Sequence, residues 1–257
     1  MSSISFVTGR PAMVIGKALV VADLHLGIER EFYKSGIKFP SQTHMIVEQI
    51  DMLIKEAGSR KLIILGDVKH KVPGISMQEL REIPDFLEYF SKKIKVEIVP
   101  GNHDGGIENL LPENVKIHES SGFVLGDVYL SHGHSWPGPE FLGCSAIVMG
   151  HQHPMVEFRD RLNYRFIEQV WVRGKLMREK IMEKFKKIPK SIPEAVVMPA
   201  FNELAGGIAV NSEMAGEKAQ NYIGPVIKAL DRKSLRIFML DGTYLGKLPD
   251  ISGAKFN

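Results

Sequence analysis

Cysteine is nearly absent from this 257-residue sequence, since Cys144 is the only one. A single cysteine excludes a disulfide within the chain and is typical of proteins from a reducing compartment. The N-terminal residues lack the charged start and apolar run of a secretory signal. No stretch reaches the roughly 18 apolar residues that a transmembrane helix needs. We therefore expect a cytoplasmic protein with no membrane association.

No charge sign dominates, because 33 Lys and Arg face 30 Asp and Glu, giving a net charge of +3. Such mildly basic proteins are common, so the charge suits an anionic substrate without pointing to one. Repeats and low-complexity tracts are also missing. The length and ordinary composition predict a single domain over residues 1–257. No convincing domain boundary is visible, and residues 186–193 are the best candidate for a hinge.

Strand and helix patterns alternate over the first hundred residues. Short Val- and Ile-rich runs predict buried strands at 18–22, 61–65 and 96–99. Helical spacing predicts a helix at 41–58, capped by Ser41 and stopped by Gly58. A second helix is expected at about 76–93, where Pro84 predicts a kink or two shorter helices. The apolar side of that helix would comprise Leu80, Phe86, Leu87 and Phe90.

The pattern changes after residue 113 to short strands with tight turns. The runs at 116–118, 122–125, 128–131 and 146–149 read as antiparallel elements of a second sheet. Further short strands are expected at 165–171, 195–198, 207–210, 236–240 and 243–245. A helix is expected at 174–187, with Met177, Ile181 and Phe185 on one face. The predicted fold class is α/β, with two packed, mixed β-sheets flanked by helices.

Seven of the nine histidines fall in five compact clusters, each directly after or near a strand-like run. The clusters are Asp23-Leu24-His25, Gly66-Asp67-Val68-Lys69-His70, Gly101-Asn102-His103-Asp104, His132-Gly133-His134 and Gly150-His151-Gln152-His153. Taken alone, the histidine of any one cluster could be a structural residue that is hydrogen-bonded within the fold. Together they supply the mixture of imidazole nitrogen with carboxylate and amide oxygen that divalent metals prefer. Two neighbouring ions need a shared carboxylate and ligands from several loops.

The five clusters, in this order, resemble the signature of the calcineurin-like metallophosphoesterase superfamily, whose fold is a pair of sheets sandwiched by helices. The resemblance covers residues 23–153 and implies that one ion is held by Asp23, His25, Asp67 and His153. The other ion would be held by Asp67, Asn102, His132 and His151, with Asp67 as the bridge. It also implies manganese, although mixed nitrogen and oxygen ligands suit Fe, Zn, Co and Ni as well.

The expected chemistry is hydrolysis of a phosphate ester by a hydroxide formed from water shared by the two ions. His103 is expected to act as the general acid. Asp104 has two readings: it bonds the His103 imidazole and sets its tautomer, or it caps a helix in the next loop.

The residues within the first two clusters narrow the resemblance to the SbcD-like DNA-repair exonuclease branch. They are Ala22-Asp23-Leu24-His25-Leu26-Gly27 and the spacing from Gly66-Asp67 to His70. In that branch a histidine at the position of His70 assists the substrate; a histidine bonded to its own loop is the alternative. Val68, Lys69, His70 and Asp104 disfavour the protein-phosphatase branch. We find no match to the DNA-contacting cap or the ATPase-docking segment of the full-length nucleases before Asn257.

Several residues outside the ligand set are candidates for substrate binding, each with a structural alternative. His134 contacts substrate or supports the metal ligands. Arg30 and Lys34 are placed to meet an extended anion, although Glu29 and Glu31 flank Arg30, so a local ion pair of Arg30 is an equal alternative. The cationic stretch 173–190 is more often a solvated helix face than a phosphate-binding one. Stacking on a base is one reading of Trp136 and Phe141, and core packing is the safer one. His44 and His118 receive no role.

Three functions remain open. The first is a metal-dependent phosphodiesterase or nuclease acting on DNA, RNA or a nucleotide. The second is a phosphatase or phosphodiesterase for a small metabolite. The third is a non-catalytic scaffold, which the complete ligand set disfavours. Protein partners are unknown from the sequence, and a homo-oligomer is compatible with it.

Overall fold

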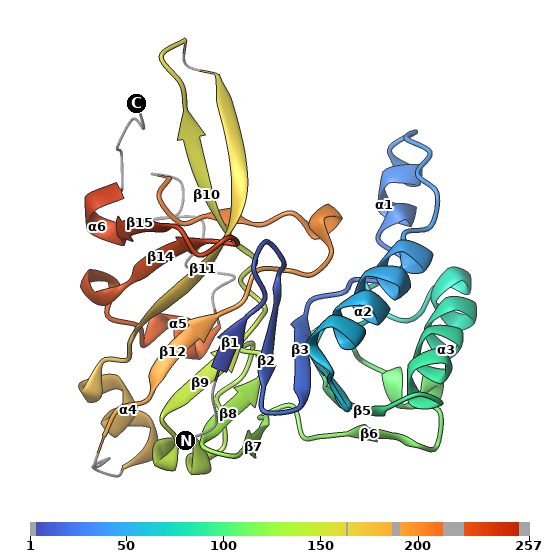
Figure 1. The fold of residues 1–257 in the computed structure, drawn as a ribbon, viewed down its shortest axis with the longest axis horizontal. Coiled ribbons are helices and arrows are strands. Elements are labelled where there is room, and N and C mark those ends of the chain that lie inside the picture. The colour runs from blue at the N-terminus through green and yellow to red at the C-terminus, as the bar shows by residue number, and fades with distance from the viewer. Residues whose placement is uncertain (1–3, 163, 187–190, 213–223, 252–257) are drawn as a thin grey trace.

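The computed structural model describes residues 4–162, 164–186, 191–212 and 224–251. It is an α/β structure with two mixed sheets and helices packed against them (Figure 1). The first sheet runs β1(Ile4–Phe6), β2(Ala12–Ile15), β3(Ala18–Ala22), β4(Lys61–Leu65), β5(Lys95–Val99) and β6(Val115–Ile117). Within the described ranges no helix is long and apolar enough to cross a bilayer.

Three parallel strands, β3, β4 and β5, form the centre of the first sheet. All five residues of β3 and the last four of β4 and β5 are buried, as expected for strands covered on both faces. The crossover helices are α2(Thr43–Ala57) and α3(Met77–Ser91). Since the three strands run the same way, their carboxyl ends meet at one edge of the sheet.

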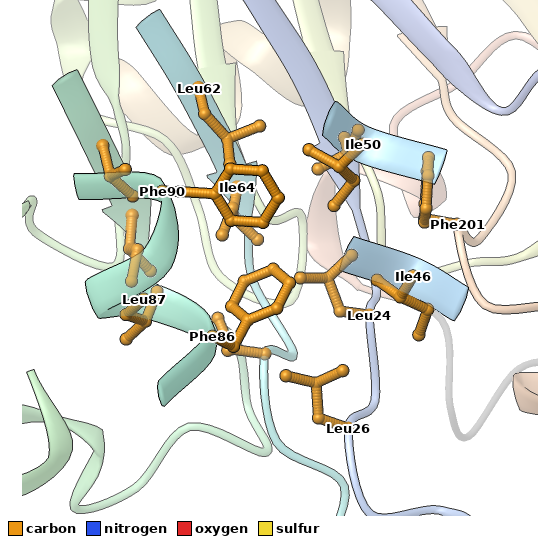
Figure 2. Packing of buried hydrophobic residues seen from close by; sticks show 14 of the residues in the cluster. Leu24, Leu26, Ile46, Ile50, Leu62, Ile64, Phe86, Leu87, Phe90 and Phe201 are labelled. Carbon is orange, nitrogen blue, oxygen red and sulfur yellow. The ribbon is translucent and has the colours of Figure 1, made fainter. Parts of the chain in front are cut away.

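The helices α2 and α3 pack on the first sheet through a layer of aliphatic and aromatic side chains (Figure 2). Phe86 and Phe90 of α3 lie beside each other with ring centroids 5.1 Å apart. Ile50 of α2 and Ile64 of β4 belong to the same cluster, as does Leu24 from the loop after β3. The core therefore anchors the loop between two predicted ligands, Asp23 and His25.

Both helices differ from expectation in detail. The N-cap of α2 is Gln42, not Ser41. The hydroxyl of Ser41 accepts from the Thr43 N–H at 3.3 Å and donates to Glu82. Gly58 ends α2 in the left-handed conformation, as predicted. Pro84 lies inside α3, which is one continuous helix, so the division into two helices is wrong.

The exposed side of α3 explains why Pro84 is tolerated there. Proline removes the N–H that would bond the carbonyl four residues earlier, which is that of Leu80. Leu80 is 45% exposed, so this side of the helix faces solvent, where a carbonyl without a backbone partner costs less than in the core. Its exposure also corrects the placement of Leu80 on the apolar face.

The second sheet has nine strands: β7(Phe123–Leu125), β8(Val128–Ser131), β9(Ala146–Met149), β10(Pro154–Arg159), β11(Arg165–Lys175), β12(Glu194–Val197), β13(Ile208–Ala209), β14(Arg236–Met239) and β15(Tyr244–Lys247). It is mixed and not antiparallel throughout, because β9 pairs in parallel with both β8 and β12. The strand β6 was expected here, but it pairs in parallel with β5 and extends the first sheet.

Some elements were missed or misplaced along the sequence. The strands β1, β2 and β10 were not predicted, nor were the short helices α1(Glu29–Lys34), α5(Pro225–Lys228) and α6(Leu248–Ile251). The helix expected at 174–187 is shorter, because residues 174 and 175 continue β11 and α4(Arg178–Phe185) begins after them. Residues 187–190 of the cationic stretch lie outside the described part. In Figure 1 the β10–β11 hairpin and α1 extend from the same end of the molecule.

Truncation of Phe86 tests the packing of α3 on the sheet. Phe86 is 2% exposed, so we expect Phe86→Ala to lower the free energy of unfolding by about 3–5 kcal/mol through lost burial and a residual cavity. Leu80→Ala, on the exposed face of the same helix, should change it by less than about 0.5 kcal/mol. Denaturant unfolding measures both, and equal losses would contradict this packing.

Candidate metal centre

All seven predicted ligands follow strands whose carboxyl ends meet at the interface of the two sheets. From the first sheet come Asp23 and His25 after β3, Asp67 after β4 and Asn102 after β5. From the second sheet come His132 after β8, and His151 and His153 after β9. Because β8 and β9 are parallel to each other, their ends also lie at one edge. The site is therefore assembled from five loops of two sheets.

The ligand atoms form two neighbouring groups. One group is Asp23, His25 and His153, and the other is Asp67, His132 and His151; within each, the ligand atoms lie within 4.8 Å of one another. Asn102 joins the second group, with its Oδ1 3.2 Å from His132 Nε2.

Asp67 lies between the two groups. Its Oδ2 is 3.6 Å from His25 Nε2, and its Oδ1 is 3.4 Å from His132 Nε2. Its two oxygens thus face different groups, an arrangement in which one carboxylate could contact both ions.

Separations between ligand atoms lie at the long end of the hydrogen-bond range or just beyond it. His153 Nε2 is 3.4 Å from both His25 Nε2 and Asp23 Oδ1. Ligands at about 2.1 Å from a common ion are separated by roughly 3–3.4 Å from one another. Asp23 Oδ1 is buried and accepts no hydrogen bond, a costly state for a carboxylate oxygen without a cation. The chemistry and spacing of these donors therefore fit divalent metal ions.

Backbone strain is concentrated in the same residues. Across the described ranges, six residues other than glycine have positive φ, and five of them belong to the ligand set: Asp23, His25, Asp67, His151 and His153. This conformation costs about 1–3 kcal/mol per residue and persists only where the surroundings enforce it. The positions of these five side chains are held against local backbone preference.

Two glycines make room for the ligands. A Cβ at Gly66 would overlap the ring of His132, and a Cβ at Gly101 would overlap the Asp67 carboxylate. The same carboxylate accepts from the backbone N–H of His103 at 2.9 Å. Close approach of the chain thus both requires glycine at 101 and orients Asp67.

The electrostatics show what the cluster needs. Burial alone would raise the pKa of Asp67 and of Asp23, but neighbouring imidazoles, chiefly His132 and His153 respectively, lower both. Burial opposes protonation of His132 too, yet Asp67 raises its pKa to about 9. Burial lowers the pKa of His25 to about 3, so this ring is neutral and able to bind metal through a lone pair. The two carboxylates thus draw positive charge into the site.

The rings of His70 and His103 lie beside His25. Their centroids are 5.3 and 4.9 Å from that of His25, and the three rings also offer ligand atoms within 4.8 Å of one another. His70 Nδ1 is 3.3 Å from His25 Nδ1. His103 Nδ1 is 2.5 Å from the carbonyl oxygen of His70. Because a carbonyl oxygen only accepts hydrogen bonds, Nδ1 of His103 carries a proton. The other ring nitrogen, Nε2, takes no part in this hydrogen bond.

Asp104 does not contact the His103 ring as expected, because its carboxylate is directed to the backbone. Its oxygens accept from the N–H groups of Gly101 at 2.8 Å and Lys69 at 3.2 Å. The His70 carbonyl takes the role expected of Asp104 at the imidazole. Asp104 is not a helix cap either, since Gly106 precedes the next helix. Its burial raises its pKa to about 6.

The expected substrate residues lie around the centre. His134 is half-buried next to His132 and His151, with ring centroids 5.1 and 6.1 Å away, and its buried Nδ1 has no hydrogen-bond partner. Arg30 and Lys34 are exposed on α1. Lys34 donates to Glu31 at 2.7 Å, an ion pair that was not expected.

The aromatic residues and remaining histidines belong to the scaffold. Phe141 is buried, and Trp136 packs edge-on against Phe185 at 5.7 Å, so core packing is confirmed over base stacking for Phe141. His118 stacks on Phe123 with centroids 3.7 Å apart. His44 is exposed on α2.

Sequence reasoning missed the residues that support the ligand loops. Asn202 is buried, and its Nδ2 donates to the carbonyl of Leu24 at 2.9 Å, which ties the segment after β12 to the loop of Asp23 and His25. Lys69 and Glu79 are each 1% exposed and bond the backbone around His70. The one available signal was the Ser76-x-x-Glu79 spacing, which is typical of a capping box.

Comparison with solved structures finds proteins that this chain resembles. Among solved structures the chain is similar to a nuclease, MPE of Pseudomonas putida, with 21% identity and a TM-score of 0.53 over 93% of this chain and 98% of that one. It is also similar to Yfce, a phosphoesterase from E. coli, with 21% identity and a TM-score of 0.34 over 56% of this chain and 73% of that one. At such identity the first likeness shows a shared fold.

No protein with curated function matches the chain. Residues 16–155, which contain all five clusters, match the family Calcineurin-like phosphoesterase. The chain therefore belongs to the calcineurin-like phosphoesterase family and is a metal-dependent phosphoesterase.

Proposed function

We propose that this protein hydrolyses phosphodiester bonds of nucleic acid or nucleotides with two divalent ions, manganese being the expected pair. The observation that carries the proposal is the position of Asp67, whose two oxygens face separate groups of ligands. One ion would be held by Asp23, His25, Asp67 and His153. The other would be held by Asp67, Asn102, His132 and His151. Ions held by these residues would supply an acidified water and would neutralise phosphate oxygens.

The protein's own groups supply orientation and a proton. The His70 carbonyl holds the proton on His103 Nδ1, so the doubly protonated imidazole would donate the proton on its Nε2 to the leaving oxygen as the P–O bond breaks, and the neutral ring would keep its Nδ1 proton. His70 adjoins His25 Nδ1 and supports that ligand's orientation while its ring remains half-exposed toward substrate. Asp104 holds the Gly101 turn, so we assign it a structural role.

Access to the centre supports a large substrate. Asn102 is exposed, and His70, His103, His151 and His153 are only partly buried. The residues of the first two clusters support membership of the SbcD-related branch, and that branch favours a polynucleotide substrate. Arg30, on the exposed surface of α1, and His134, with its unpartnered Nδ1, are the proposed substrate contacts. Lys34 would have to leave Glu31 to join them.

The alternative is a phosphatase or phosphodiesterase for a small metabolite, acting through the same ligands. A single domain and a cytoplasmic location remain proposals, the latter supported by the lone, buried and unpaired Cys144. Homo-oligomerisation also remains a proposal.

The substrate class is tested with matched aryl phosphate mono- and diesters, then with single-stranded and duplex DNA. With manganese we expect the diester to be cleaved faster than the monoester and at least one DNA form to be degraded. The reason is that some of the ligand residues are at least partly exposed, so a long phosphodiester chain can reach them. Cleavage of the monoester alone, with both DNA forms intact, would favour the small-metabolite alternative and contradict the nuclease proposal.

Replacing the shared carboxylate tests the two-ion site. Loss of Asp67 removes one ligand from each group, so we expect Asp67→Ala to bind fewer metal equivalents and to lose activity by at least about 100-fold, more than an outer ligand partner costs. Asp85→Ala, an exposed carboxylate on α3, is the control and should match wild type. Metal content and diester hydrolysis measure both, and an active Asp67→Ala would remove the enzymatic account.

A methyl group at Gly101 tests the crowding around Asp67. Since a Cβ there would overlap the Asp67 carboxylate, we expect Gly101→Ala to weaken metal binding by about 10–100-fold, measured by calorimetric titration. Gly105→Ala in the same loop is the matched control, because a Cβ at Gly105 meets nothing within 4 Å and its φ is not positive. Equal metal affinity in the two variants would show that close packing at Gly101 is not needed.

A further inference from the structure

Glu79 makes contacts that its position in α3 does not require. We propose that Glu79 is a positioning residue that holds His103 in the orientation for proton donation. The inference rests on the proposed function, in which His103 protonates the leaving group. Glu79 itself contacts neither of the two ligand groups; it acts through the backbone of residues 70 and 71.

One oxygen of Glu79 accounts for the helix cap. Glu79 Oε2 accepts from the Ser76 N–H at 2.5 Å, while the Ser76 hydroxyl accepts from the Glu79 N–H at 3.2 Å. This reciprocal pair is a complete capping box. The helix start needs nothing more from this side chain.

The other oxygen is directed away from the helix toward the active site. Glu79 Oε1 accepts from the backbone N–H groups of Lys71 at 2.7 Å and His70 at 3.0 Å. The His70 N–H is shared with the carbonyl of Leu26 at 3.1 Å. A carboxylate that accepts from several N–H groups in a buried place forms strong bonds, because water does not compete for them.

Packing fixes the Glu79 side chain itself. It is 1% exposed, and a Cβ at Gly27 would come within 2.9 Å of Glu79 Cγ. The loop after His25 therefore lies directly against this side chain, and the left-handed φ of 88° at Gly27 suits glycine. Glu79 thus touches both the loop of His25 and the loop of His70.

A buried lysine secures the same segment from its other side. Lys69 Nζ donates to the carbonyl oxygens of Lys71 at 2.6 Å and Gly74 at 3.0 Å. Lys71 is consequently held through its N–H by Glu79 and through its carbonyl by Lys69. The peptide groups around His70 have little freedom to rotate.

This rigidity reaches the reacting group through one carbonyl. The oxygen of His70 accepts from His103 Nδ1, which sets the tautomer and the rotation of the imidazole. If the peptide after His70 rotated, the carbonyl would turn away and His103 Nε2 would lose its direction toward the leaving oxygen. Esters with poor leaving groups depend on that proton, whereas a 4-nitrophenolate leaves without it.

The experiment compares an alkyl and a 4-nitrophenyl phosphodiester in wild type, Glu79→Gln and His103→Asn, all loaded with metal. Glutamine cannot accept at both ends of its amide, so it keeps the cap or the His70 bonds but not both. We expect the ratio of alkyl to 4-nitrophenyl hydrolysis to fall about 10–100-fold in a further variant, Glu79→Ala, which loses both sets of bonds, and by no more than that in Glu79→Gln; this is part of the usual value of general acid catalysis. In the zinc-loaded form, the ¹⁵N signal of His103 should show loss of the fixed Nδ1–H tautomer.

Ser76→Ala is the matched control, because it breaks the other half of the capping box and leaves Glu79 Oε1 in place. It should lower the melting temperature and keep the ratio of wild type. An unchanged ratio in folded, metal-loaded Glu79→Ala, which has no oxygen left for either side, would overturn the inference; if Glu79→Ala does not fold, an unchanged ratio in both Glu79→Gln and Glu79→Asp would overturn it. If His103→Asn itself keeps the wild-type ratio, the role of His103 in the proposed function fails first.

Discussion

Two carboxylates buried side by side, Asp23 and Asp67, are the constraint on which the rest of the structure depends. Each is almost wholly removed from water, and burial by itself opposes their ionisation. Their negative charge favours positive charge nearby, since Asp67 and Asp23 raise the pKa of His132 to about 9 although burial alone would lower it. A site that attracts positive charge this strongly, through nitrogen and oxygen donors set for coordination, is built for divalent ions.

The fold holds these groups together against several local preferences. Ligands in left-handed backbone conformations, a carboxylate oxygen with no hydrogen bond, and a turn at Gly101 too crowded for any Cβ are all unfavourable alone. They persist because the loops begin at buried strands and are tied to one another, as Asn202 ties the loop of Leu24. The hydrophobic core under α2 and α3 thus serves the chemistry by making those strand ends immobile.

Much of this arrangement could be predicted from the sequence, because ligand types and strand ends are local features. Asp23, Asp67 and His132 each follow a run that reads as a buried strand, so their convergence was foreseeable. The direction of pairing in the second sheet was not, since a short strand such as β9 looks the same in parallel and antiparallel surroundings. Glu79 was also out of reach, because its second oxygen acts on a loop that only the tertiary structure brings near. For the same reason Asp104 was assigned to His103, which a backbone carbonyl in fact contacts.

The central claim is that one carboxylate joins two ions, and crystals grown with manganese test it most directly. Anomalous scattering near the manganese absorption edge locates the ions without reference to the protein. The account predicts two peaks per chain, about 3.5–4 Å apart, with Asp67 in contact with both. A single peak that Asp67 does not touch, or no peak at saturating manganese, would contradict it.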